Sequence, residues 1–169
     1  DEAMQAAFTS GTDIHTATAA QVFHVNPADV THEMRRRAKA VNFGIVYGIS
    51  AFSLSQDIGV TVAEAKAYME AYFATFPGVR RYMDSVVAQA KEQGYVETLF
   101  HRRRELPEIR SSNFNMRSFG ERVALNMPIQ GTAADIMKLA MVAVEKRLKR
   151  ELPEAKLVLQ VHDELIVEC

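Results

Sequence analysis

The chain has 169 residues, of which 48% are hydrophobic and 24% charged, and its formal net charge at pH 7 is -1. This composition is typical of one compact domain or two small lobes, and it excludes a disordered or low-complexity chain. No apolar run approaches the roughly 20 residues that a membrane-spanning helix needs, and a single cysteine excludes an internal disulfide framework, which fits a reducing cytoplasm.

Capping residues in the first half of the chain predict a series of helices. "DIHTATA" places His15 near the start of one helix, and "NPAD" at 26–29 offers an Asn cap and a Pro in the first helical position. Thr31 is expected to cap the next helix, which runs towards Gly48. The remaining helices are predicted from Ser50 to near Gly59, from a capping box at 61–64 to about Phe76, and from Pro77 to Gly94.

The second half combines one long helical region with two β segments. "YVETLF" at 95–100 predicts a strand, and the basic "HRRR" after it predicts a tight turn or hairpin. A helical region is expected over about 113–150, with an interruption at "NMPIQG", where Pro128 and Gly131 break the pattern. Two β-rich runs over about 156–169 flank "HDE" and predict an antiparallel hairpin. The predicted class is α+β, mainly helical with small antiparallel β-hairpins.

Positive charge is concentrated at the start of the helix expected from Thr31. Residues 1–30 contain no Lys or Arg, whereas "RRRAK" at 35–39 contains four cations. The spacing of four places Arg35, Lys39, Phe43 and Tyr47 on one stripe of the helix. An amphipathic helix with a solvated basic end would also give this pattern, although cations at a helix N-terminus oppose the helix dipole. A nucleoside triphosphate, with phosphates at one end and a flat ring at the other, fits the stripe.

Two further candidate features have simple structural explanations as well. His15 precedes an Ala- and Thr-rich run, which is compatible with a histidine at a helix start that has no role in binding. Asp163 and Glu164 are expected at the tip of the C-terminal hairpin, where turns commonly contain Asp. Adjacent carboxylates on a rigid hairpin are also suited to form half of a Mg²⁺ site. A two-metal site would need a further carboxylate from elsewhere.

Taken together, these segments resemble the polymerase domain of family A DNA polymerases. "RRRAKAVNFGIVYG" resembles the family's motif B on the fingers helix, at about 31–47, and "LQVHDELIVE" resembles motif C of the palm, at about 156–169. "DIHTATA", "GYVETLFHRRRELP" and "NMPIQGTAADIMKLAM" resemble the connecting segments in the same order. The resemblance covers essentially the whole chain. It implies a fingers subdomain over 1–110 and a partial palm over 111–169.

The resemblance implies roles in nucleotide binding for residues near motif B. His15, Arg35 and Lys39 would hold the triphosphate of the incoming deoxynucleotide, and Lys39 would also act as a proton donor to the leaving pyrophosphate. Phe43 would pack against the base and sugar, and a Phe here is associated in the family with rejection of dideoxynucleotides. Tyr47 would occupy the template-base position until the fingers close.

The resemblance also implies DNA and metal contacts in the second half. The residues that would read the minor groove of the primer–template are Arg122, Asn126 and Gln130. His162 would lie by the primer terminus, and Asp163, with Glu164 beside it, would bind catalytic Mg²⁺, of which the complete enzyme uses two ions. The arginines at 102–104 would contact backbone phosphate or lie in a solvated turn.

The family's motif A, with the second metal-binding Asp, is expected upstream of residue 1 and is absent from the sequence. The chain also opens without an initiator Met and closes on "LIVEC", inside an apolar run, so we expect a piece of a longer chain. Because this piece lacks one metal carboxylate, it is expected to be inactive alone. The implied activity of the parent is template-directed DNA synthesis in replication and repair, by a monomeric cytoplasmic enzyme that acts on primer–template DNA and deoxynucleoside triphosphates and not on membranes.

Two alternatives remain open on the sequence. A non-catalytic helical nucleic-acid-binding module would use the same basic patches and would show salt-sensitive DNA binding without a response to nucleotide. A single-subunit phage-type RNA polymerase shares the Arg, Lys and Tyr-Gly frame of motif B. Phe43 and the Glu that follows His162 and Asp163 favour the DNA enzyme over this second alternative.

Overall fold

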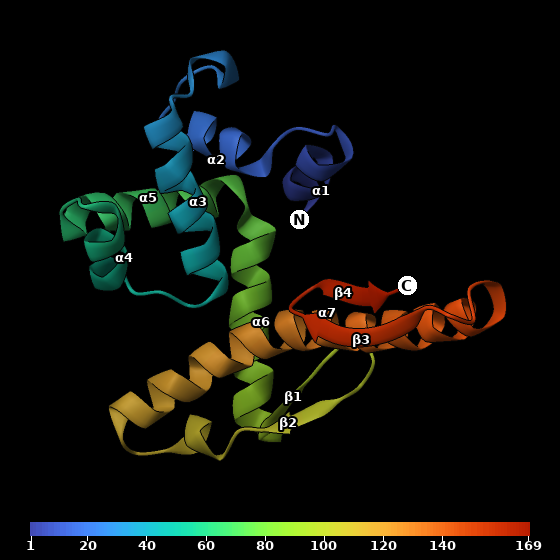
Figure 1. Ribbon diagram of the computed structural model, residues 1–169. Helices are drawn as coiled ribbons and strands as arrows, with labels where there is room; N and C mark the ends of the chain where they lie inside the picture. Colours follow the sequence, from blue (N-terminus) through green and yellow to red (C-terminus); the bar gives the residue numbers. More distant parts are fainter. The chain divides into compact units, whose positions relative to one another are not determined.

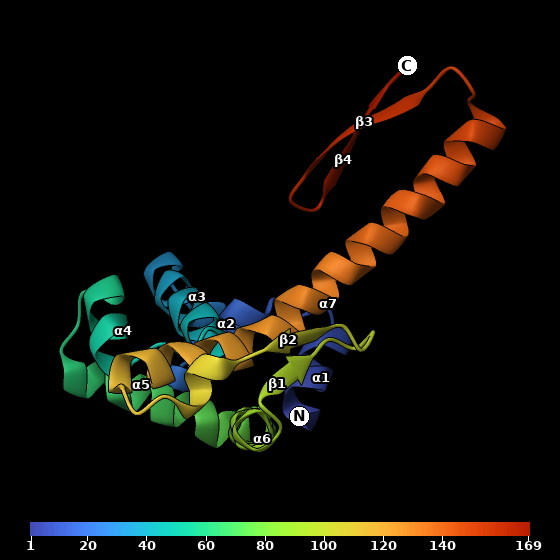
Figure 2. The same cartoon turned by 90° about the horizontal axis from the view of Figure 1, so that it is seen from below.

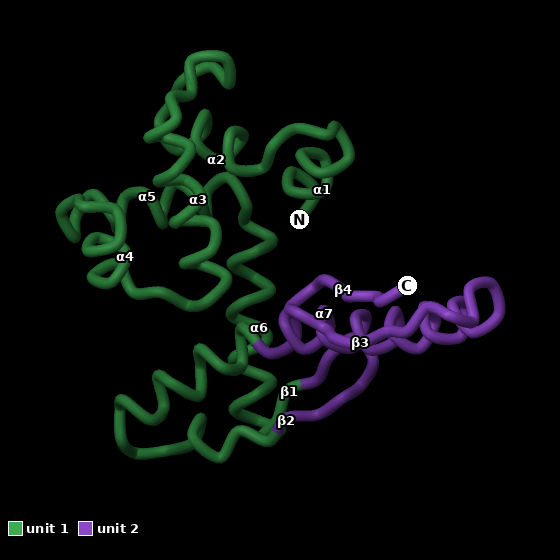
Figure 3. The backbone as a smooth tube through the Cα atoms, viewed as in Figure 1, with its two compact units in different colours: residues 1–96, 105–126 green, residues 97–104, 127–169 purple.

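The structure, a computed structural model, describes residues 1–169 and confirms the mainly helical α+β class (Figure 1). Contacts between Cα atoms divide the chain into two compact units. Unit 1 comprises residues 1–96 and 105–126, and unit 2 comprises residues 97–104 and 127–169 (Figure 3). The division into fingers at 1–110 and palm at 111–169 concerns function and stays a prediction.

Unit 1 contains six α-helices before the first strand, and most of them begin and end at the predicted residues. The hydroxyls of Thr31, Ser50 and Thr61 each accept a hydrogen bond from a backbone N–H in the first turn. Gly59 and Gly94 end their helices in the left-handed conformation, as expected for glycine after a helix. The helices are α1 (Glu2–Thr9), α2 (Ile14–Val22), α3 (His32–Val46), α4 (Ala51–Ile58), α5 (Val62–Thr75) and α6 (Pro77–Gln93).

Two features near the N-terminus differ from the sequence-based expectation. Residues 26–29 form only the short 3-10 helix η1 (Pro27–Asp29), and the side chain of Asn26 makes no capping hydrogen bond. Helix α1 was not predicted, and its N-cap is Asp1, whose carboxylate accepts from the Met4 amide and from the Gly78 amide at the start of α6. A tertiary contact with α6 therefore supports this short helix.

The hydrophobic core of unit 1 lies where α3, α4 and α5 pack together. Its centre consists of the buried residues Val41, Ile45, Leu54, Ile58, Ala65, Tyr72 and Phe76. Helix α2 packs against both α3 and α5, and the contacts with α3 are the more extensive. Because Val41 and Ile45 are buried on one side of α3, the opposite side is left to present Phe43 and Tyr47, which are 46% and 41% exposed.

Helix α7 (Phe114–Glu151) runs without interruption through the segment where a break was expected, so this prediction was wrong. Pro128 lies inside the helix and lacks the N–H that would donate to the carbonyl four residues earlier. A helix of 38 residues can tolerate the loss of one such bond. In the next turn the hydroxyl of Thr132 donates to the Pro128 carbonyl oxygen.

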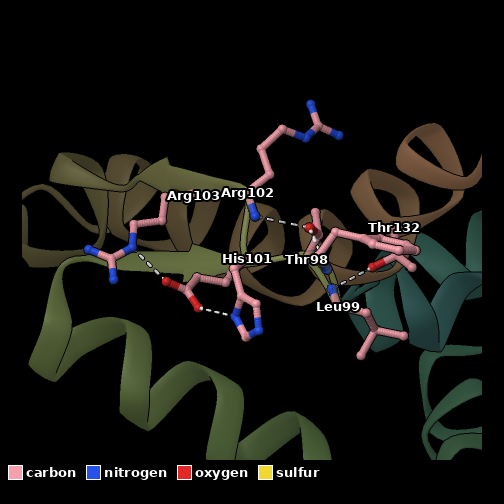
Figure 4. Close-up of polar contacts among 8 residues, drawn as sticks. Thr98, Leu99, His101, Arg102, Arg103 and Thr132 are labelled. Carbon is pink, nitrogen blue, oxygen red and sulfur yellow. Dashed lines mark hydrogen bonds and ion pairs between the residues drawn. The ribbon is translucent and has the colours of Figure 1, made fainter. Parts of the chain in front are cut away.

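Gly131 does not end the helix, because its role is to allow close packing. A Cβ atom at this position would lie 2.7 Å from Cγ2 of Thr98, in the turn between strands β1 (Tyr95–Glu97) and β2 (Arg103–Glu105). Thr98 is buried, and its hydroxyl accepts from the amides of Phe100 and Arg102. The Leu99 amide donates to the Thr132 hydroxyl at 3.0 Å (Figure 4).

Arg102 adds a second link between this turn and α7. Its Nε lies 2.8 Å from Oδ1 of Asp135, and its NH2 group donates to the Gly131 carbonyl. On the other side of the turn, Glu97 pairs with Arg103 at 2.6 Å and with His101 at 3.3 Å (Figure 4). Two members of the arginine run at 102–104 are therefore engaged in contacts within the chain.

The C-terminal hairpin forms as predicted from strands β3 (Lys156–Val161) and β4 (Glu164–Glu168), which follow α7 in unit 2 (Figure 2). The strands are antiparallel, and Val161 pairs with Glu164, so the turn consists of His162 and Asp163 alone. His162 has a positive φ of 53°, a conformation that non-glycine residues adopt rarely. Glu164 is thus the first residue of β4 and does not share the tip with Asp163 as expected.

Candidate functional site

The side chains predicted to bind a nucleotide gather on the exposed side of α3 and at the start of α2. The rings of Phe43 and Tyr47 are nearly parallel, with centroids 6.4 Å apart and an interplanar angle of 12°. The ring of His15 lies 5.7 Å from that of Phe43, and Nζ of Lys39 lies 5.8 Å from the Phe43 centroid. The packing of α2 against α3 therefore brings His15 to the stripe that the sequence predicted.

Arg35, at the N-terminal end of the stripe, forms a two-point ion pair with Asp13. Its Nε and NH2 groups donate to the two carboxylate oxygens at 2.8 and 3.1 Å. Asp13 is also the N-cap of α2, because its carboxylate accepts from the Thr16 amide. The hydrogen bonds from Arg35 and Thr16 hold the pKa of Asp13 well below its usual range. This carboxylate is therefore ionised near neutral pH.

Lys39 takes part in no ion pair, so its ammonium group is available to an anionic ligand. It lies one turn from Arg35 and beside an aromatic ring, which places two cations and two rings in line.

His15 is half-buried, and this burial is the main cause that lowers its pKa; Asp13 opposes the effect, and Arg35 and Lys39 add to it. The imidazole of His15 is thus suited to act as a neutral hydrogen-bond donor beside two cations.

The far end of the stripe opens on a pocket of about 590 Å³ in unit 1. Phe43 and Tyr47 line one side of this pocket, and Arg122 of α7 lines another. Gly48, with a φ of 69°, permits the close approach, since a Cβ atom there would lie 3.1 Å from Leu125 and 3.2 Å from Arg122. The structure thus joins one predicted DNA-contacting residue to the predicted nucleotide stripe.

The other predicted DNA and metal residues are distributed between the two units. Asn126 is the last residue of unit 1 and lies one helical turn after Arg122, whereas Gln130 belongs to the part of α7 in unit 2. His162 and Asp163 form the turn of the hairpin in unit 2, and Glu164 begins strand β4. All three residues of this motif are exposed.

Comparison with known proteins decides the family. The family model for DNA polymerase family A matches residues 1–169. The chain belongs to DNA polymerase family A. The family resemblance inferred from the sequence motifs is thereby confirmed.

Relatives in this family are similar to the chain along its whole length. DNA polymerase I of Geobacillus stearothermophilus is 59% identical over 169 residues, which are 100% of this chain and 19% of that protein. DNA polymerase I of Bacillus subtilis is 57% identical over 169 residues, which are again 100% of this chain and 19% of that protein. The chain therefore spans about a fifth of the length of these family A relatives.

A solved structure has the same fold. It is described as the POL domain of Pol1 from M. smegmatis in complex with DNA primer-template and dNTP. The TM-score is 0.89 and the sequence identity 48%, and the match covers 96% of this chain and 29% of that one. The fold of the chain thus matches that of this polymerase domain.

The carboxylates of Asp163 and Glu164 in the hairpin are suited to provide some of the ligands of a Mg²⁺ site. Asp163 is exposed at a two-residue turn, and neither it nor Glu164 forms an ion pair that would compete with a metal ion. No three His, Cys, Asp or Glu side chains of the chain are grouped so that they could hold a metal ion between them. Mg²⁺ commonly takes one or two protein carboxylates and completes its shell with water and phosphate oxygens.

Three polar residues beside the stripe were not predicted from the sequence as parts of the site. Asp13 pairs with Arg35, Asn42 contacts His15, and Thr18 contacts Asn42. A sequence signal exists for two of them. Asp13 is a helix cap in "TDIHT", and Asn42 is an isolated amide in the otherwise apolar run "AVNFGIV".

Proposed function

We propose that this chain forms the nucleotide-binding part, and a share of the catalytic centre, of a template-directed DNA polymerase. The reaction is transfer of a nucleotide from a deoxynucleoside triphosphate to the 3′-hydroxyl of a primer. The observation that carries this proposal is the alignment of Arg35, Lys39, Phe43 and Tyr47 on one side of α3, with His15 beside Phe43. The family supports it, as do the DNA primer-template and dNTP bound by the M. smegmatis neighbour.

The triphosphate is held by His15, Arg35 and Lys39, each of which can donate a hydrogen bond to phosphate oxygen. The ammonium group of Lys39 also gives a proton to the leaving pyrophosphate. Phe43 packs against the base and sugar of the nucleotide, since its ring lies next to the ammonium group of Lys39. Tyr47 stacks at the template-base position, at the pocket it shares with Phe43 and Arg122.

Primer–template DNA is contacted by Arg122, Asn126 and Gln130 of α7 and by His162 of the hairpin. The minor groove presents acceptors that differ little between base pairs, so donors such as these read the shape of a pair and not its sequence. Arg122 has the best support, because it lines the same pocket as Tyr47.

Asp163 and Glu164 would hold catalytic Mg²⁺, with two ions in the complete site. The chemistry that bound Mg²⁺ would supply is charge stabilisation of the phosphoryl transfer. The chain's own residues contribute chiefly by positioning the triphosphate and by providing fixed positive charge around it.

We further propose that residues 1–110 act as fingers and residues 111–169 as part of a palm. The curated relatives are about five times longer than the chain, which supports a function within a larger polypeptide. The chain supplies Asp163 but not the second metal-binding Asp of the family's motif A, so the 169 residues alone are proposed to be inactive. From the family resemblance alone, the parent is proposed to be a cytoplasmic monomer. None of the helices combines the length and the apolar composition that a membrane-spanning segment requires.

The test is a Lys39→Ala substitution in the full-length protein that contains this chain. Single-nucleotide incorporation should need a much higher deoxynucleotide concentration, whereas the affinity for primer–template DNA should stay near that of the wild type. Lys66→Ala is a suitable control, because Lys66 is an exposed lysine of α5 whose only ion pair is with Glu70. Equal losses of nucleotide and DNA affinity in Lys39→Ala would contradict contact with the triphosphate.

A further inference from the structure

A chain of side-chain hydrogen bonds connects α2 to α3 behind the nucleotide stripe. The hydroxyl of Thr18 donates to Oδ1 of Asn42 at 3.1 Å, and Nδ2 of Asn42 lies 2.9 Å from Nδ1 of His15. Thr18 is completely buried, and Asn42 is 9% exposed. Two buried polar side chains between the helices are thus linked in series: Thr18 contacts Asn42, and Asn42 contacts Nδ1 of the half-buried His15.

The directions of these two hydrogen bonds determine which nitrogen of His15 carries the proton. An asparagine amide has one oxygen that accepts and one nitrogen that only donates. In the structure the oxygen of Asn42 accepts from the Thr18 hydroxyl and the amide nitrogen faces His15, so Nδ1 of His15 must accept. A neutral imidazole that accepts at Nδ1 carries its single hydrogen on Nε2.

We propose that Asn42, itself oriented by Thr18, is a positioning residue that holds His15 in the Nε2–H tautomer, so that its one N–H donor is offered to the triphosphate. This inference rests on the proposed function and adds to it two residues that do not touch the nucleotide. It also explains why an amide is buried among Val41, Gly44 and Ile45, where an apolar side chain would otherwise be expected.

Burial and the two cations near His15 act in the same direction as the amide, and Asp13 opposes them. Asp13 lies two residues before it on the cap of α2, and Arg35 and Lys39 face it from α3. Burial lowers the pKa of His15, Asp13 opposes this, and both cations assist it. A proton added at Nδ1 would in addition meet the N–H groups of Asn42. Burial and the two cations thus favour the neutral form of His15, and the donor at Nε2 is present in both the neutral and the protonated ring.

The test exchanges the amide for a carboxylate, Asn42→Asp, in the full-length protein with histidines labelled with ¹³C. The Cδ2 shift reports the tautomer, the Cε1 shift followed against pH reports the pKa, and the His15→Gln variant identifies the signal. In the wild type we expect the Nε2–H tautomer and a pKa below the ordinary histidine value. In Asn42→Asp, a partner that only accepts should move the hydrogen to Nδ1 and raise the pKa of His15.

The kinetic consequence in Asn42→Asp is a pH dependence that the wild type lacks. Below the raised pKa, His15 is protonated and still offers Nε2–H, whereas above it the lone pair of Nε2 faces the triphosphate. The KM for deoxynucleotide should therefore rise by up to about tenfold per pH unit above that pKa, because one proton is linked to binding. The control Gln21→Glu adds the same charge on an exposed site of α2 away from His15 and should leave KM independent of pH.

A second variant covers the case in which Asn42→Asp does not fold. Thr18→Val keeps the shape of the buried side chain but removes the hydroxyl that orients the amide, and it should give a mixture of both His15 tautomers. An Nδ1–H tautomer in the wild type would overturn the proposal, and so would a changed tautomer that leaves KM unaltered. The NMR readings need no catalysis, so their failure is distinguishable from a failure of the Lys39→Ala test of function.

Discussion

If Arg35 holds the triphosphate as proposed, its ion pair with Asp13 implies that the triphosphate competes with a carboxylate for the same guanidinium. Substituting Asp13→Asn removes the charge and keeps the shape. An asparagine caps a helix about as well as an aspartate, so the hydrogen bond from the Thr16 amide, and with it the start of α2, should be preserved. The expected result is tighter binding of deoxynucleotide.

The size of the effect follows from the exposure of the pair. The two hydrogen bonds measure 2.8 and 3.1 Å, which is good two-point geometry, but the side chains of Arg35 and Asp13 are 43% and 41% exposed. Solvent screens such a pair strongly, so its loss should change an equilibrium by only about two- to fivefold. The dissociation constant for deoxynucleotide should therefore fall by about two- to fivefold.

The assay is the dependence of single-turnover incorporation on deoxynucleotide concentration, in the full-length protein with saturating primer–template. Glu33→Gln provides a matched control, because Glu33 lies at the same end of α3 but pairs with Arg36 and Arg37 instead of Arg35. Its affinity for nucleotide should equal that of the wild type within twofold. An unchanged or weaker affinity in Asp13→Asn would show that the carboxylate does not compete for Arg35, and the reasoning would be refuted.

Two further predictions concern the metal-binding motif. In the full-length protein, Asp163→Ala should nearly abolish turnover while leaving the affinity for primer–template largely unchanged, and a wild-type rate in single-turnover assays would contradict a role in metal binding. The purified 169-residue chain should not extend a primer, because it contributes only one side of the two-metal site, and measurable Mg²⁺-dependent incorporation by this chain would show the proposal of inactivity to be wrong.

Local signals in the sequence predicted most helix boundaries correctly. The caps at Thr31, Ser50 and Thr61 and the left-handed glycines at 59 and 94 act within one helical turn, so they can be recognised without knowledge of the fold. The stripe on α3 was predictable for the same reason, because a spacing of four fixes which side chains share a face of a helix.

What the sequence could not predict depends on contacts between distant segments. Gly131 was interpreted as a break because glycine lowers helix propensity, yet it is needed where α7 meets the turn around Thr98. Helix α1 is held in part by a hydrogen bond between Asp1 and Gly78, 77 residues apart in sequence. The link from Asn42 to His15 likewise spans 27 residues and becomes visible only when α2 and α3 are packed together.

The close contact between Gly131 and Thr98 means that neither position can be altered independently of the other. A methyl group at 131 would overlap Cγ2 of Thr98, which cannot rotate away without losing the hydrogen bonds that its hydroxyl accepts from Phe100 and Arg102. Serine at 98 would keep that hydroxyl and lack the obstructing methyl, so alanine at 131 is compatible with this packing only together with serine at 98. The two positions are 33 residues apart in sequence, but they form a compensating pair, because the methyl carbon of Thr98 occupies the space that a Cβ atom at 131 would need.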